Sequence, residues 1–106
     1  MRFVETHVFT AAIDRHLDDE QYRQLQIGLM LRPEQSPVMR GAGGLRKVRW
    51  AMTGAGKRGL RVIYYIYWEP RKDVFYMVYA YKTSEQGDVT AAQTRQLSRV
   101  VREEFA

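Results

Sequence analysis

Lysine and arginine side chains are concentrated in the middle of this sequence. Seven of them lie between positions 40 and 61, namely Arg40, Arg46, Lys47, Arg49, Lys57, Arg58 and Arg61. No aspartate or glutamate occurs between Glu34 and Glu69. With no carboxylates nearby in the sequence, these cations are predicted to stay unpaired and to give one surface a strong positive potential. Such a surface suits an anion, above all a phosphate group.

The spacing of the cations predicts that several converge on two neighbouring strands. Side chains alternate between the two faces of a strand, so Lys47 and Arg49 share a face within residues 45–50. Residues 61–68 are rich in β-branched and aromatic side chains, and the glycine-rich residues 53–59 between the two strands are typical of a turn. If the hairpin turns near Ala55, Arg49 faces Arg61. Because like charges placed opposite each other destabilise a sheet, we infer that a bound phosphate compensates them.

The composition excludes most familiar catalytic sites. The chain has no cysteine and only two histidines, His7 and His16, which excludes disulfides, thiol nucleophiles and the common zinc sites. The GAGG stretch at 41–44 lacks the following helix of a phosphate-binding loop, and the basic region contains no paired carboxylates. A cluster of cations remains, which could stabilise the transition state of a phosphodiester.

RNA would bring its own nucleophile to such a cluster, because its 2′-hydroxyl lies beside the phosphate. A lysine crowded by other cations gives up its proton more readily, so it could serve as the base. Arginine stays charged and would hold the phosphate in a fork of two hydrogen bonds.

Composition and charge indicate one small cytoplasmic domain with a polyanionic partner. The 106 residues support a single core, and 45% of them are hydrophobic. The net charge of +5 favours RNA, DNA or the ribosome, although an acidic protein would also fit. The sequence shows no apolar signal region and no run of about 18 apolar residues, so neither export nor membrane spanning is expected.

The remaining elements follow from periodicity and capping signals. Residues 2–9 alternate in part and predict a strand, after which Thr10 would cap a short helix over 11–17. Asp18 with Gln21 resembles a capping box that opens a helix ending before Pro33. A loop over 34–44 leads into the basic hairpin, and 74–82 is a further strand. Thr90 with Gln93 predicts a second capping box, which opens a helix over 91–104.

These elements predict an α+β domain in the order β-α-α-β-β-β-α. Consecutive strands joined by short turns favour a largely antiparallel sheet, with the helices packed on one side of it. Six of the seven tyrosines fall in the last two strands, where most should pack in the core.

The succession GAGGLRKVR, GKRGLRVIYY, YAYK and GDVT before a final helix resembles the RelE/ParE toxin superfamily, and within it the HigB branch. The resemblance covers nearly the whole chain, 1–106. It implies a RelE-like fold and a toxin of a type II toxin–antitoxin system, an mRNA interferase that enters the ribosomal A site. Such a toxin cleaves mRNA through the 2′-hydroxyl, with no metal or other cofactor. The implied partners are the ribosome, mRNA and a cognate antitoxin, often of the helix-turn-helix type.

Matched residue by residue, the resemblance implies four catalytic residues, which are Lys47, Arg49, Arg61 and Lys82. Lys47 or Lys82 would transfer protons, and Arg49 and Arg61 would hold the scissile phosphate. The residues assigned to RNA or ribosome binding are Arg46, Lys57, Arg58 and Tyr81. Some RelE members carry a catalytic tyrosine just before the last helix, where this chain has Val89 and Thr90; Tyr79 and Tyr81 lie nearby in the sequence.

Two other functions remain open at this stage. ParE-type relatives share the fold and act on DNA gyrase without cleaving RNA, although they usually lack the complete basic set. A non-catalytic RNA-binding module would use the same cations without any cleavage.

Overall fold

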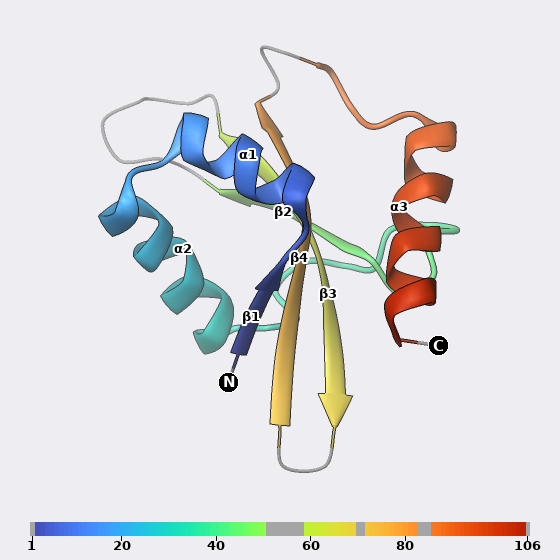
Figure 1. Cartoon of the computed structure of the whole chain (residues 1–106), viewed down its shortest axis with the longest axis horizontal. Coiled ribbons are helices and arrows are strands. Elements are labelled where there is room, and N and C mark those ends of the chain that lie inside the picture. Colours follow the sequence, from blue (N-terminus) through green and yellow to red (C-terminus); the bar gives the residue numbers. More distant parts are fainter. Residues whose placement is uncertain (1, 51–58, 70–71, 83–85, 106) are drawn as a thin grey trace.

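The computed structural model describes residues 2–50, 59–69, 72–82 and 86–105 and contains one mixed sheet with helices on both sides (Figure 1). In chain order its elements are β1 (Arg2–Glu5), α1 (His7–His16), α2 (Asp19–Leu31), β2 (Arg46–Trp50), β3 (Leu60–Glu69), β4 (Lys72–Lys82) and α3 (Ala91–Phe105). The predicted α+β class and element order are confirmed. No helix in the described ranges is both long enough and apolar enough to cross a bilayer.

The sheet has the strand order β1-β4-β3-β2. The pairs β2–β3 and β3–β4 are antiparallel, and β1 runs parallel to β4. Arg49 pairs with Arg61 across β2 and β3, which confirms the predicted register. A register shift between Ile63 and Tyr64 inserts one extra residue in β4, and beyond it Tyr81 pairs with Arg61. Three neighbouring strands therefore bring Arg49, Arg61 and Tyr81 into one row.

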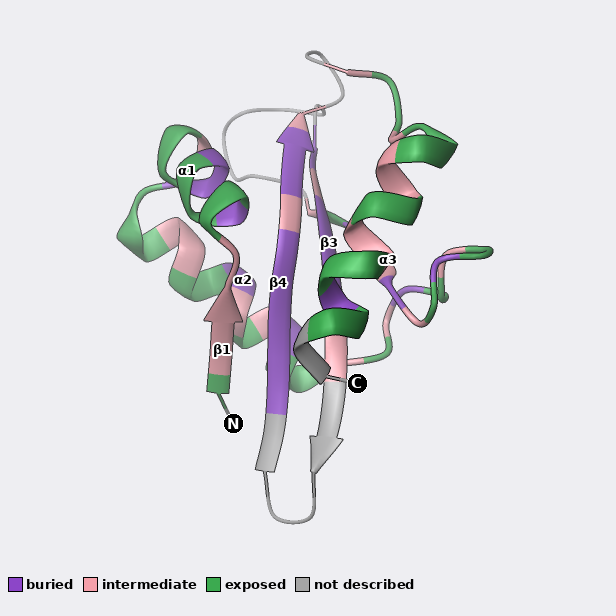
Figure 2. Ribbon diagram, turned by 45° about the vertical axis from the view of Figure 1, so that its right-hand side comes forward, coloured by how far each residue is buried: buried purple, intermediate pink, exposed green. Residues whose placement is uncertain are grey.

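Helices cover both faces of the sheet, so the prediction that they lie on one side is wrong. One core lies between the sheet and the α1–α2 pair and includes Phe9, Leu25 and Tyr64. A second core lies under α3 and includes Ile63 and Val101. The physical reason is that the central strands are apolar on both faces, and Figure 2 shows β4 buried along most of its length.

The N-terminal strand is shorter than predicted, and the first helix begins earlier. Thr6 caps α1, not Thr10, because its Oγ1 accepts a hydrogen bond from the backbone N–H of Phe9 at 3.0 Å. The same hydroxyl donates to the carbonyl of Val78 in β4 at 2.8 Å, which ties the cap to the sheet. Phe9, Ala12 and Ile13 are buried at helical spacing, so residues 7–9 follow a helical period and not a strand alternation.

The two predicted capping boxes are present. In α2 the backbone N–H of Gln21 donates to Asp18 Oδ1 at 2.8 Å, and the backbone N–H of Asp18 donates to Gln21 Oε1 at 2.9 Å. In α3 the backbone N–H of Gln93 donates to Thr90 Oγ1 at 3.0 Å, and that of Thr90 donates to Gln93 Oε1 at 2.8 Å. The second box fixes where α3 begins.

The glycines of the 41–44 loop allow it to pass close to β3 and α3. Gly41, Gly43 and Gly44 all have positive φ, at 67°, 63° and 99°. A Cβ on Gly43 would lie 2.8 Å from Ser98 Oγ, and one on Gly44 would lie 3.0 Å from the Tyr65 ring. The loop thus depends on glycine for both its backbone conformation and its close approach.

Replacing Gly44 by alanine should destabilise the protein by about 2 kcal/mol or more, because backbone strain at φ 99° adds to the contact with Tyr65. Gly41→Ala is the matched control, since Gly41 has φ 67° but, its chain neighbours aside, no atom of the described residues lies within 4 Å of its Cβ position. It should cost only the backbone term, about 1 kcal/mol. Urea unfolding of both variants measures the difference, and equal losses would mean that Tyr65 yields freely.

Candidate active site and nucleic-acid interface

Three cations from adjacent strands line one cavity on the α3 side of the sheet. β2 contributes Lys47 and Arg49, and β3 contributes Arg61, whose side chain is half-buried. The cavity has a volume of about 360 Å³, and Tyr81, Gly87 and Asp88 complete its wall. Arg61 Nη1 is 3.4 Å from the carbonyl of Gly59, a long hydrogen bond that leaves the guanidinium mostly available to an anion.

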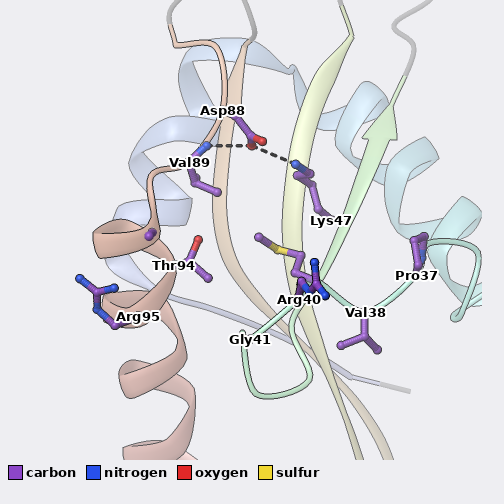
Figure 3. Close-up of a pocket in the computed structure, with 11 residues that line it drawn as sticks. Pro37, Val38, Arg40, Gly41, Lys47, Asp88, Val89, Thr94 and Arg95 are labelled. Atoms are coloured by element: carbon purple, nitrogen blue, oxygen red, sulfur yellow. Dashed lines mark hydrogen bonds and ion pairs between the residues drawn. The ribbon is translucent and has the colours of Figure 1, made fainter.

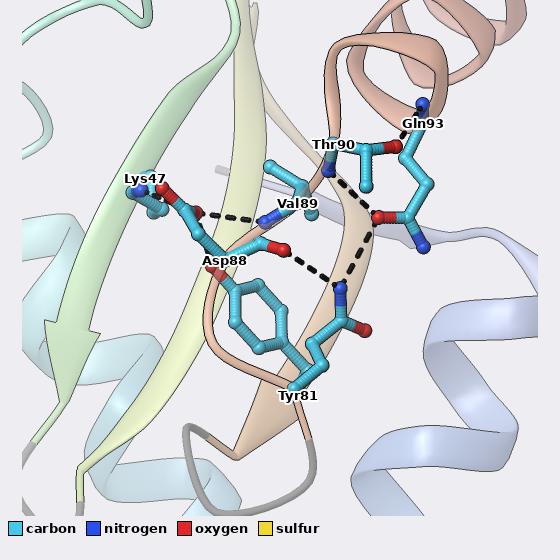
Figure 4. A network of polar contacts seen from close by, with 7 residues as sticks. Lys47, Tyr81, Asp88, Val89, Thr90 and Gln93 are labelled. Atoms are coloured by element: carbon cyan, nitrogen blue, oxygen red, sulfur yellow. Dashed lines mark hydrogen bonds and ion pairs between the residues drawn. The ribbon is translucent and has the colours of Figure 1, made fainter.

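Asp88 connects the cavity to the segment that precedes α3. Its Oδ1 accepts hydrogen bonds from Lys47 Nζ at 2.9 Å, from the Tyr81 hydroxyl at 2.9 Å and from the backbone N–H of Val89 at 2.8 Å (Figure 4). These donors lower the pKa of Asp88, with Lys47 as the largest cause. The carboxylate is therefore ionised at neutral pH and oriented by three donors, from β2, from β4 and from the next residue in the chain.

The Tyr81 hydroxyl is a donor in this network and not a base. Burial, followed by the hydrogen bond to Asp88, raises the pKa of Tyr81 to about 12, so the phenol keeps its proton at neutral pH. The residue is 3% exposed and its ring lies 5.7 Å from that of Tyr79. A ring buried in this way is not placed to stack on a base, and the hydroxyl contacts Asp88 in the cavity wall.

The expectation that the cations of the basic region form no ion pairs with carboxylates is wrong for two of them. Asp88 forms an ion pair with Lys47, and Glu34 forms one with Arg46 at 3.3 Å. Asp88 stands 41 positions after Lys47, so the lack of carboxylates between Glu34 and Glu69 could not predict whether Lys47 is paired. Three cations against one carboxylate still give the described residues of the cavity lining a net charge of +2.

Two predicted site residues lie on the opposite face of the sheet. Arg46 pairs with Tyr64, and Lys82 pairs with Leu60, both of which belong to the core under α1 and α2. Directly paired residues share a face, so neither side chain joins the cavity. Arg46 instead secures the 34–44 loop through the carbonyl of Ser36 as well as through Glu34. Lys57 and Arg58 lie outside the described residues.

Tyr79 and Thr90 are engaged elsewhere. The Tyr79 hydroxyl donates to Gln86 Oε1 at 3.0 Å, and the Thr90 hydroxyl caps α3. Tyr79 and Tyr81 were the two candidates to replace the tyrosine that this chain lacks before its last helix. Tyr81 is the one that lines the cavity, and its hydroxyl contacts Asp88 there. Sequence reasoning missed Asp88, although its place in a polar turn directly after the strand of Tyr81 is a usable signal. In the described ranges, no three acidic or histidine side chains gather as metal ligands.

The lowered pKa of Asp88 predicts a pH-dependent contribution to stability. A carboxyl whose pKa is lower in the folded state than in the unfolded state stabilises the protein at pH values above its ordinary pKa of 3.8. This contribution disappears as the pH falls through the lower, folded-state pKa. Wild type should therefore exceed Asp88→Asn in free energy of unfolding at pH 7, and the gap should narrow below pH 3.8. Urea titrations at several pH values measure it, and a gap independent of pH would contradict the ion pair.

Comparison with known proteins supports the architecture. No family model matches the sequence. Among solved structures, the chain is similar to a mutant of the E. coli toxin RelE in the free state, with a TM-score of 0.50 and 14% sequence identity. The match covers 98% of this chain and 96% of that one. Identity at this level carries information about the fold alone, and the fold of this chain is RelE-like.

Proposed function

We propose that this protein is the toxin of a type II toxin–antitoxin pair, of the HigB-like branch, and that it acts in the cytoplasm. It cleaves mRNA in the A site of translating ribosomes. The observation that carries the proposal is the cavity in which Lys47, Arg49 and Arg61 converge beside Asp88 and the Tyr81 hydroxyl. The RelE-like fold supports it, because the protein similar in structure is named a toxin.

The reaction needs a nucleophile, proton transfers and stabilisation of a growing negative charge. The 2′-oxygen loses its proton and attacks the adjacent phosphorus, the bond from phosphorus to the 5′-oxygen breaks, and the leaving oxygen gains a proton. The products are a 2′,3′-cyclic phosphate and a 5′-hydroxyl, so atoms balance without an added co-reactant. All of the required charge stabilisation can come from cations at the phosphate.

The geometry supports a division of roles among the residues. Arg49 and Arg61 face each other across β2 and β3 and hold the non-bridging phosphate oxygens from two sides. The Lys47–Asp88 pair, whose charged atoms are 2.9 Å apart, exchanges protons with the substrate. The Asp88 carboxylate is the base for the 2′-hydroxyl, and the Lys47 ammonium is the acid for the 5′-oxygen. Oδ1 of Asp88 already accepts three hydrogen bonds, which leaves Oδ2 to receive the proton.

The cations of the cavity also offer a binding surface through which an antitoxin would neutralise the toxin. A cognate antitoxin, in this branch often a helix-turn-helix protein, would cover the cations or prevent the toxin from entering the ribosome. Acidic side chains on the antitoxin would compete with RNA for the same cavity, so the complex should be weakened by salt.

Cleavage on programmed ribosomes tests the proposal. Purified protein is added to translating ribosomes with end-labelled mRNA, and the expected products end in a 2′,3′-cyclic phosphate. RNA that is bound but remains intact would support the non-catalytic module instead. Intact mRNA together with inhibition of DNA supercoiling would support the gyrase-directed alternative. Either result overturns the proposed function.

A further inference from the structure

A second, larger cavity adjoins the candidate active site. It has a volume of about 620 Å³ and lies between the 34–44 loop, β2 and the first turns of α3 (Figure 3). Lys47 and Asp88 line both cavities. The two hollows therefore adjoin each other, and the ion pair between these side chains lies at their common boundary.

The rim of this second cavity is cationic. Arg40 from the loop and Arg95 from α3 line it together with Lys47, and Asp88 is the one acidic residue among the described residues that line it. Arg40 and Arg95 are both exposed, and within the described part of the chain neither forms a salt bridge. Three cations against one carboxylate favour a negatively charged ligand, as in the neighbouring cavity.

The wall of the cavity is apolar. Val38 is 48% exposed, and Met39 and Val89, which also line the cavity, are half-buried. A volume in this range is typical of sites for small organic ligands. An apolar surface beside arginines suits a nucleotide, whose base buries a flat apolar face while its phosphate meets the guanidinium groups.

We propose that this cavity is a subsite for the nucleotide next to the scissile phosphate. The base lies against Val38 and Val89, and the phosphate on the far side of that nucleotide contacts Arg40 and Arg95. The inference rests on the proposed function, because its occupant is the same RNA strand that Arg49 and Arg61 hold. The boundary at Lys47 and Asp88 then lies between two successive nucleotides.

A charge-removal experiment on both protein and RNA tests the subsite. The variant Arg40→Ala/Arg95→Ala is compared with Arg99→Ala/Arg102→Ala, which removes two exposed arginines of α3 that line neither cavity. The substrates are ribosome-bound mRNAs in which the phosphate on one or the other side of the cleavage site is a neutral methylphosphonate. The readout is kcat/KM for cleavage.

On ordinary mRNA the Arg40/Arg95 variant should lose about tenfold or more in kcat/KM, and the control variant should match wild type. On one of the two methylphosphonate mRNAs, kcat/KM of the wild type should fall to that of the variant, whose own kcat/KM should not fall further. On the other methylphosphonate mRNA, kcat/KM of the variant should still be about tenfold below that of the wild type. Circular dichroism and thermal unfolding of both variants show whether folding is intact, and Arg95→Ala alone serves if the double variant does not fold.

A loss that is equal on all three mRNAs would overturn the subsite, since the arginines would then contact something other than this phosphate. No loss on any mRNA would overturn it as well. Failure of the proposed function looks different, because wild type itself would then leave the ordinary mRNA uncleaved.

Discussion

Arg61→Ala should abolish toxicity and leave the fold intact. Arg61 lines the cavity from β3, directly opposite Arg49, and among the described residues its guanidinium has one hydrogen bond, a 3.4 Å contact with the carbonyl of Gly59. Removing one preorganised donor to the transition-state charge typically costs about 10²–10³ in rate. We therefore expect cleavage on ribosomes to fall by at least about 10² and growth inhibition to disappear.

The same variant should be as stable as wild type or slightly more stable. Two like charges opposite each other destabilise a strand pair by a few tenths of a kcal/mol or more, and alanine removes that repulsion. Loss of activity with unchanged or increased stability is expected of a residue kept for function. Urea unfolding alongside the cleavage assay measures both properties.

Two further variants sharpen the test of Arg61. Arg61→Lys keeps the charge but loses the planar fork, so its rate should lie between those of wild type and Arg61→Ala. Arg99→Ala removes an exposed arginine of α3 outside both cavities and should behave as wild type. A folded Arg61→Ala protein with full toxicity would remove this residue from the site.

The sequence was most informative where a local rule decides the structure. Asp18 with Gln21 and Thr90 with Gln93 form the predicted capping boxes because each box depends on residues only three positions apart. The register of Arg49 against Arg61 was predictable because β2 and β3 follow each other in the chain and pair antiparallel.

Predictions that depended on distant contacts failed. The Thr6 hydroxyl that caps α1 is held in place by a hydrogen bond that it donates to the carbonyl of Val78 in β4. Val78 lies 72 positions later, so the residues around Thr6 could not predict this contact. The second core under α3 exists because the 34–44 loop and Val101 reach the same face of the sheet. Asp88 meets Lys47 because the residues just before α3 lie on the same side of the sheet as the Lys47 side chain. Each of these contacts depends on the tertiary fold.

Asp88→Asn should separate catalysis from binding. Asparagine can still accept hydrogen bonds at the position of Oδ1 but cannot take a proton from the 2′-hydroxyl. If Asp88 exchanges protons with the substrate, kcat should fall by about 10²-fold or more. Affinity for ribosome-bound mRNA should rise at the same time, because the cavity lining changes from a net charge of +2 to +3.

The rise in affinity distinguishes this role from a purely structural one. If Asp88 only positions Lys47 and Tyr81, its loss should weaken binding along with turnover, since the cations would no longer be held toward the phosphate. Asp14→Asn makes the same change in total charge on the exposed face of α1, away from both cavities, and should leave kcat and affinity unchanged. Single-turnover cleavage with saturating toxin isolates kcat, and filter binding to ribosomes programmed with a 2′-deoxy mRNA isolates affinity. An unchanged kcat with tighter binding would assign Asp88 to charge balance alone and leave the base to be sought elsewhere in the cavity.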